Sequence, residues 1–126
     1  MIEPGIKNTL VRKVTDKDTA LALGSGLLNV FSTPMLIAFM EEASHTMVAP
    51  YLDEGASTVG ISMNMKHLAA TPVGMEVKIN AVLKEVDRKR LVFEVEAYDE
   101  AGLIGTAVHE RFIVDSEKFM QKVNSK

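Results

Sequence analysis

Strict alternation of apolar and polar residues in the second half of the chain constrains the fold more than any other feature. Apolar side chains occupy every second position across residues 75–83 and again across residues 91–97. Successive side chains of a β-strand point to opposite faces, so this period of two predicts strands with one covered face and one solvated face. Segments 57–66 and 103–114 are expected to be strands as well.

One long helix is expected before these strands. Thr33 suits the N-cap and Pro34 the first helical position, where its missing amide hydrogen costs nothing. Pro50 is expected to end the helix. Apolar residues at three- and four-residue steps predict a stripe that faces a core: Leu36, Phe39, Met40, Ala43 and Met47.

The order of elements predicts the fold class. A first strand is expected at Ile6–Val14, followed by a short helix or turn at 15–18 and a mobile apolar loop at 20–26. A polar hairpin turn at 87–90 and a terminal helix at 116–123, capped by Ser116, complete the prediction. A strand, a long helix and four strands favour an α+β hotdog fold, in which an antiparallel sheet wraps around one central helix. All 126 residues (1–126) are expected to form a single domain.

Composition and charge exclude several classes of protein. A net charge of −3 argues against broad nucleic-acid binding, which needs basic excess. The absence of cysteine excludes disulfides, thiol nucleophiles and thiolate metal sites. The three histidines lack zinc-site spacing, so neither a metal nor another cofactor is expected. The N-terminus lacks signal-peptide features and no segment is apolar enough for a membrane span, so a soluble cytoplasmic protein is expected.

Three side chains supply the groups needed to transfer an acyl group to water. Thr33 carries a hydroxyl, Glu41 a carboxylate and His67 an imidazole. His67 has the parity of Val59, Ile61, Met63 and Met65, and is therefore expected on the covered face of its strand. Each residue also has an ordinary structural interpretation: Thr33 as a helix cap, Glu41 as an exposed partner of His45, and His67 as a hydrogen-bonded core residue.

The chain resembles the fluoroacetyl-CoA thioesterase family of hotdog enzymes between about Val30 and Val123. The resemblance rests on the spacing of Thr33, Glu41 and His67, on Ala49-Pro50-Tyr51-Leu52, on Ala69-Ala70-Thr71-Pro72 and on His109-Glu110-Arg111. It implies hydrolysis of a short-chain acyl-CoA, with Thr33, Glu41 and His67 as the catalytic set. It also implies a homodimer or higher oligomer with active sites at the subunit interface.

Four further residues are expected to contact substrate. The resemblance points to Gly60, near the acyl group, although a bulge or tight packing would also explain a glycine there. Arg111 could hold a carboxylate or phosphate, or form an ion pair with Glu41, Glu110 or a terminal carboxylate. Leu27 and Phe31 belong to a lid segment with no aromatic residue before Phe31, which favours a short acyl group other than fluoroacetyl.

The spacing along the helix also predicts a composite site. Thr33 and Glu41 should lie about 12 Å apart along the axis, so His67, substrate or a partner subunit must connect them. The sequence leaves open whether Thr33 or Glu41 is the nucleophile. Two other functions remain: a non-catalytic hotdog protein that binds acyl-CoA or another metabolite, and a hotdog dehydratase, for which no aspartate–histidine motif is found.

Overall fold

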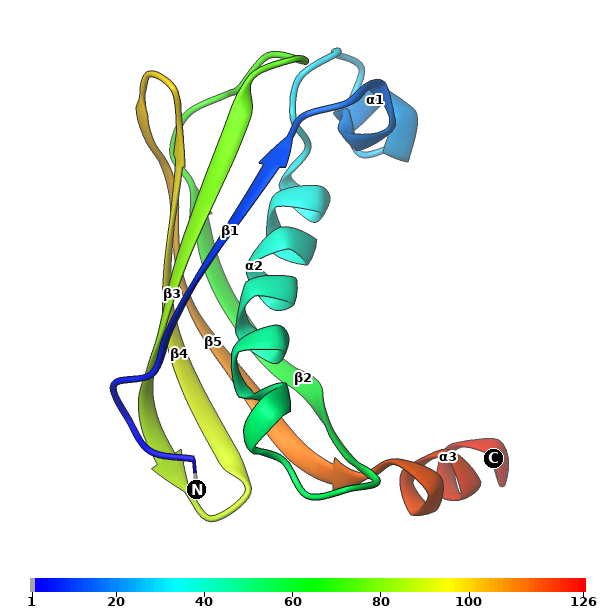
Figure 1. Cartoon of the computed structure of the whole chain (residues 1–126). Coiled ribbons are helices and arrows are strands. Elements are labelled where there is room, and N and C mark those ends of the chain that lie inside the picture. Colours follow the sequence, from blue (N-terminus) through cyan, green and yellow to red (C-terminus); the bar gives the residue numbers. More distant parts are fainter. Residues whose placement is uncertain (1) are drawn as a thin grey trace.

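Five antiparallel strands form one sheet in the computed structural model, which describes residues 2–126. Their order across the sheet is β1-β3-β4-β5-β2. Figure 1 shows the sheet curving around the 16-residue helix α2 (Thr33–Val48). The strands are β1 (Lys7–Lys13), β2 (Ala56–His67), β3 (Glu76–Asp87), β4 (Arg90–Asp99) and β5 (Gly102–Asp115). This arrangement confirms the predicted α+β hotdog fold.

The core lies between α2 and the inner face of the sheet. The alternating residues of β3 and β4 are all at most 2% exposed: Val77, Ile79, Ala81, Leu83, Leu91, Phe93, Val95 and Ala97. They cover Leu36, Met40 and Ala43 of α2, which are fully buried. Full burial of a large apolar side chain contributes about 1.5–3 kcal/mol. The buried residues of the two strands and of the helix stripe therefore account for much of the stability.

A β-bulge in β2 changes which of its residues face the helix. The pairing of β2 with β5 shifts between Gly60 and Ser62. Before the bulge, Thr58 is buried on the helix side; after it, Met63 and Met65 pack against the core. The prediction that Val59 and Ile61 share the covered face with His67 is therefore wrong, and Ile61 is 53% exposed. Alternation fails here because a bulge adds one unpaired residue and reverses the parity beyond it.

The helix ends also differ from the prediction. Ser32, not Thr33, is the N-cap of α2, because its Oγ accepts a hydrogen bond of 3.2 Å from the Met35 amide. The helix ends at Val48, and Pro50 lies in the following 3₁₀ turn η2 (Ala49–Tyr51). Asp115, not Ser116, caps the terminal helix α3 (Ser116–Asn124). In both cases the side chain one residue earlier reaches the free amides.

The segment before α2 is more ordered than predicted. A 3₁₀ turn, η1 (Asp16–Asp18), leads into the short helix α1 (Ala20–Leu23), where a mobile loop was expected. The Thr19 side chain caps α1, and Gly24 ends it in the left-handed conformation with φ of 74°. The segment between α1 and α2 nevertheless exposes two large apolar side chains, Leu27 (88%) and Leu28 (69%).

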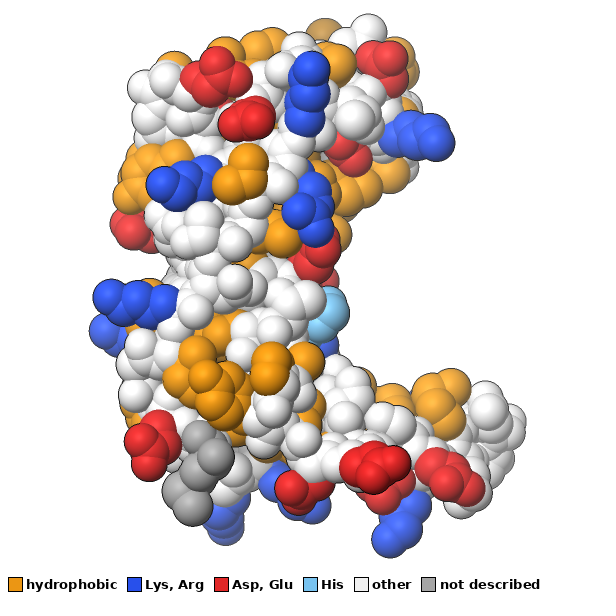
Figure 2. All heavy atoms as spheres, viewed as in Figure 1, with side chains coloured by type: hydrophobic (Ala, Val, Ile, Leu, Met, Phe, Trp, Pro, Cys, Tyr) orange, Lys and Arg blue, Asp and Glu red, His pale blue; other side chains and the backbone are white. Residues whose placement is uncertain are grey.

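The two ends of the molecule project beyond its middle. Figure 2 shows a hollow between the end that carries α1 and the end that carries α3. Helix α3 extends away from the sheet and exposes Phe119, Met120 and Val123. None of the helices within residues 2–126 has the length and apolar character needed to span a membrane.

Candidate active site

Thr33 and His67 meet where the first turn of α2 passes the end of β2. The Oγ1 atom of Thr33 and the Nδ1 atom of His67 are 2.8 Å apart, a hydrogen-bond distance. The pair borders a cleft of about 360 Å³ whose walls come from α1, the segment before α2 and residues 68–70. Because Ser32 caps the helix, the Thr33 hydroxyl is free to bind the imidazole.

One nitrogen of the His67 ring is available to bind a further partner. Its Nε2 atom is buried and has no hydrogen-bond partner within residues 2–126. Burial lowers the pKa of His67, and the nearby backbone of Ala69 opposes this effect. A buried nitrogen without a partner costs about 1–3 kcal/mol, so a bound group that satisfies Nε2 would recover this cost.

Glu41 lies farther along α2, above Gly60 of β2. A Cβ atom added to Gly60 would come within 2.9 Å of the Glu41 Oε2 atom. The same oxygen is 3.5 Å from Arg111 Nη1 on β5. Glu42 turns the other way and accepts a 2.6 Å hydrogen bond from Arg12 on β1. The structure thus distinguishes the two adjacent carboxylates, and the one beside β2 and β5 is Glu41.

Arg111 is held rigidly beneath Glu41. Its Nε atom donates to Thr58 Oγ1 at 2.8 Å, and its Nη2 atom to the Thr58 carbonyl at 3.0 Å. Burial lowers the pKa of Arg111, and the Glu41 carboxylate opposes this effect. The ion pair with Glu41 that the sequence offered as one interpretation is present; contact with a ligand stays a prediction. Thr58 was missed because strict alternation placed it on the solvated face.

These contacts form two separate groups in one chain. Thr33 and His67 lie at the start of α2, whereas Glu41, Gly60 and Arg111 lie about 12 Å farther along the helix axis. No hydrogen bond or ion pair within the described part of the chain connects the groups. The bulge nevertheless turns both Gly60 and His67 toward the helix, although their odd separation would place them on opposite faces of a regular strand.

The two predicted lid residues occupy different environments. Phe31 is 1% exposed and packs against Phe39 with ring centroids 5.3 Å apart, but it also borders the cleft. Leu27 is 88% exposed and is not part of the cleft wall. Their contact with substrate stays a prediction.

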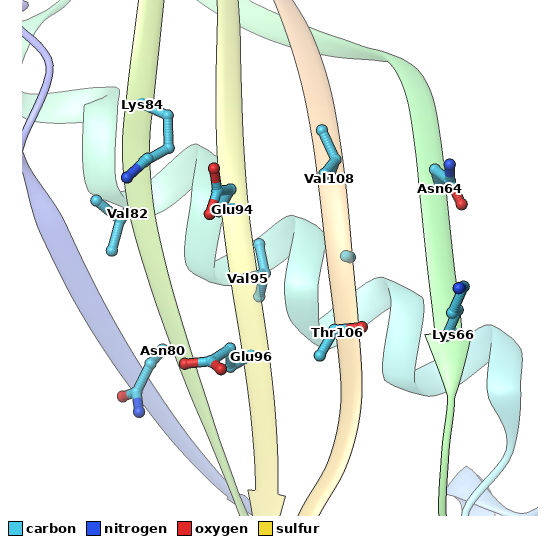
Figure 3. Close-up of a pocket in the computed structure, with 11 residues that line it drawn as sticks. Asn64, Lys66, Asn80, Val82, Lys84, Glu94, Val95, Glu96, Thr106 and Val108 are labelled. Atoms are coloured by element: carbon cyan, nitrogen blue, oxygen red, sulfur yellow. The ribbon is translucent and has the colours of Figure 1, made fainter.

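A second hollow, of about 430 Å³, lies on the opposite face of the sheet. Figure 3 shows its side chains standing on β2–β5, with α2 behind the sheet. The charged residues there are Lys66, Lys84, Glu94 and Glu96. This mixture of positive and negative charges is typical of the solvated face of an antiparallel sheet, and the hollow lies on the other side of the sheet from the helix. It is therefore not the candidate active site. Within residues 2–126, no group of three or more acidic or histidine side chains is placed to hold a metal ion.

The fold defines a hotdog-fold protein, and its solved relatives place it in the thioesterase class. A solved thioesterase superfamily member from Thermus thermophilus is 28% identical with a TM-score of 0.91, over 99% of this chain and 93% of that chain. Residues 14–117 match the family described as fluoroacetyl-CoA-specific thioesterase. The chain belongs to this family.

Two further matches within the family support this assignment. The fluoroacetyl-CoA thioesterase of Streptantibioticus cattleyicolor is 39% identical over 97 residues, which are 77% of this chain and 70% of the relative. The solved structure of the fluoroacetyl-CoA thioesterase FlK is 32% identical with a TM-score of 0.96, over 100% of this chain and 98% of that chain. Variants of FlK have been crystallised with acetyl-CoA and with fluoroacetate and CoA.

Proposed function

We propose that this protein hydrolyses a short-chain acyl-CoA thioester to the free acid and CoA. The Thr33–His67 hydrogen bond beside the cleft carries the proposal, because it leaves a buried Nε2 atom without a partner. A thioester carbonyl oxygen would supply that partner. Family membership and the acyl-CoA ligands of FlK favour a thioester over other carbonyl compounds.

In the proposed mechanism, His67 and Thr33 act on the carbonyl oxygen. The Thr33 hydroxyl donates to Nδ1, which leaves the proton of the neutral ring on Nε2. The Nε2–H group then donates to the carbonyl oxygen as it becomes an oxyanion. The lowered pKa of His67, which results mainly from burial, favours this neutral form at pH 7.

Glu41 activates the attacking water in this scheme. Its carboxylate takes a proton while the water oxygen bonds to the carbonyl carbon. The carbon–sulfur bond then breaks, and the proton held by Glu41 passes to the departing thiolate. The contact of Glu41 with Arg111 is an ion pair at 3.5 Å rather than a hydrogen bond, so lone pairs of the carboxylate stay free for water.

The acyl group is expected to be short and not fluorinated. The segment over the cleft carries Leu23, Leu27 and Leu28 and no aromatic residue before Phe31. Leu27 and Leu28 are exposed and would gain apolar contacts by closing over a bound acyl chain. Before Phe31 this segment has no aromatic ring whose edge or face could distinguish a C–F bond from a C–H bond.

Two copies of the chain would complete each site. Strand β2 is at the edge of the sheet, so a second β2 could pair with it. In a symmetric antiparallel pair of β2 strands, the numbers of any two facing residues add up to the same value. A two-fold axis near Met63 and Asn64 would therefore bring Gly60 close to His67 of the partner subunit. Glu41 above Gly60 would then meet the Thr33–His67 pair of the other subunit.

Thiol release from a panel of acetyl-, propionyl-, butyryl- and fluoroacetyl-CoA tests the proposal. We expect hydrolysis of at least one non-fluorinated substrate, and loss of this activity in Thr33→Ala, Glu41→Gln and His67→Ala. Binding without thiol release would support the non-catalytic alternative. Hydration of crotonyl-CoA without thiol release would instead identify a dehydratase, and a strong preference for fluoroacetyl-CoA would contradict the proposed substrate class.

A further inference from the structure

A buried polar cluster beneath Glu41 contains side chains that take no direct part in the reaction described above. It contains His109, Arg111 and Thr58, which are 1%, 7% and 8% exposed. All three lie on the helix side of the sheet, where the neighbouring positions of β3 and β4 are apolar. Buried polar groups are less favourable than apolar ones unless every donor and acceptor is paired, so the pairing in this cluster is informative.

The hydrogen bonds of Arg111 restrict its guanidinium to one orientation. Thr58 binds Nε and Nη2 and so fixes one side of the planar group. Only Nη1 remains to face the site, and it lies 3.2 Å from His109 Nε2 and 3.5 Å from Glu41 Oε2. One nitrogen with two hydrogens therefore serves both the imidazole and the carboxylate.

The partners of His109 determine its protonation state. The Nδ1 atom is 2.8 Å from the Ser62 carbonyl, which only accepts, so Nδ1 carries a proton. The Nε2 atom faces Arg111 Nη1, which only donates, so Nε2 carries none. Both contacts require the neutral ring with its proton on Nδ1. Phe93 covers the ring in a stacked arrangement, with centroids 6.0 Å apart.

The charges around His109 act in both directions. Burial is the main factor that lowers the pKa of His109, and Arg111 adds to it. The Ser62 carbonyl, Glu41 and Glu110 oppose this effect. A proton on Nε2 would place two cations within 3.2 Å and remove the acceptor that holds Nη1.

We propose that His109 is a positioning residue that, through Arg111, holds the Glu41 carboxylate over Gly60. Its Nε2 atom fixes the direction of Arg111 Nη1, which in turn fixes the carboxylate. The bulge links this cluster to β2, because Ser62, whose carbonyl holds Nδ1, ends the shift in register that begins at Gly60. The catalytic consequence rests on the proposed function, whereas the hydrogen-bond chain itself does not.

Two amide variants of His109 test the two halves of this hydrogen-bond chain separately. The amide oxygen of His109→Gln lies near the original Nε2 position and can still accept from Arg111. The amide of His109→Asn lies near Nδ1 and can donate to Ser62 but cannot reach Arg111. We expect the glutamine variant to retain kcat within about threefold and the asparagine variant to lose about tenfold or more, with KM unchanged in both. His45→Gln, an exposed histidine on α2, is the matched control with unchanged kinetics.

A merely structural role would lower the stability of both His109 variants without separating their kcat values. A folded asparagine variant with wild-type kcat would therefore overturn the proposal. Nitrogen-15 NMR of the wild-type protein tests the chain independently of activity: we expect the tautomer with the proton on Nδ1, and the other tautomer or a charged ring at pH 7 would also overturn it. If no thioester is hydrolysed, the proposed function fails, and the NMR result still decides whether the hydrogen-bond chain through His109 exists.

Discussion

Thr33 and His67 are 34 residues apart in the sequence, yet their side chains share a 2.8 Å hydrogen bond at the mouth of the cleft. The contact exists because α2 begins beside the last residue of β2. Neither residue reaches Glu41 within the chain. The candidate site therefore consists of two half-sites spaced along one helix.

Replacement of the two adjacent glutamates separates the catalytic carboxylate from a structural one. Glu41→Gln removes the proposed base, and we expect kcat to fall by about 100-fold or more. Glu42→Gln is the matched control, because Glu42 binds Arg12 on the exposed side of the helix. It should cost less than about 1 kcal/mol of stability and leave kcat unchanged. Steady-state thiol release and urea unfolding measure the two effects, and equal losses of kcat would contradict the assignment.

Ser32 and Thr33 should divide stability and activity between them. Ser32→Ala removes the N-cap of α2 and should lower the free energy of unfolding by about 0.5–2 kcal/mol. Thr33→Ala leaves this cap intact but removes the hydrogen bond to His67, so turnover should fall with little change in stability. Thr33→Ser keeps the hydroxyl and should restore most of the turnover. Thermal unfolding and kcat of the three variants are sufficient, and a Thr33→Ala variant with full turnover would argue against a role for the hydroxyl.

Gly60 should tolerate no side chain in the active enzyme. An alanine Cβ would lie 2.9 Å from Glu41 Oε2, and the half-exposed glutamate is the more mobile of the two groups. We expect Gly60→Ala to displace the carboxylate and reduce kcat about tenfold or more, while the melting temperature changes little. Ser62→Ala, on the same strand, keeps its backbone carbonyl and serves as the control. Wild-type kcat in Gly60→Ala would show that the position of the carboxylate is unimportant.

The stability of the protein should decrease in mild acid. Burial lowers the pKa of both His67 and His109 from the ordinary value of 6.5. The unfolded chain then binds more protons than the folded one below about pH 6.5, so the free energy of unfolding is retained above that pH and decreases below it. Urea unfolding between pH 8 and pH 5 measures this slope. His109→Gln should show a shallower slope, whereas His45→Gln should retain the wild-type slope; identical slopes in all three would contradict the prediction.

Mixed oligomers test whether the half-sites combine across subunits. Glu41→Gln and His67→Ala should each be inactive alone. A dimer with one copy of each variant would retain one site with both residues intact, so random mixing should recover about a quarter of wild-type activity. Co-expression with two affinity tags isolates the mixed dimer for assay. No recovery in that species would place Glu41 and His67 of one subunit in the same site.

Several features of the fold were predictable from residue order. The alternation in β3 and β4 identified every fully buried residue of these strands, because a regular strand has a local period of two. The apolar stripe of α2 was predictable for the same kind of reason. The start of the helix was not predictable, because Ser32 and Thr33 are both favourable N-caps and the backbone path determines which one reaches the Met35 amide.

The candidate site was predictable as a set of residues but not as an arrangement. Resemblance to the family selected Thr33, Glu41 and His67, and the structure pairs only the first and the last. Thr58 and the contacts of His109 were not predicted, because both depend on the bulge at Gly60–Ser62. A bulge depends on the pairing of β2 with β5, which is a contact between distant segments rather than a local pattern.

The sequence alone thus determined the types and order of the elements, the inner faces of the regular strands and the family, because these follow from local periodicity and from the identity of spaced residues. Tertiary structure decided that Gly60 and His67 both face α2, that Glu41 rather than Glu42 lies beside Arg111, and that Thr33 is free to bind His67. Each of these outcomes depends on how two segments approach one another in space. One unpaired residue in β2 is enough to reverse which side chains meet the helix.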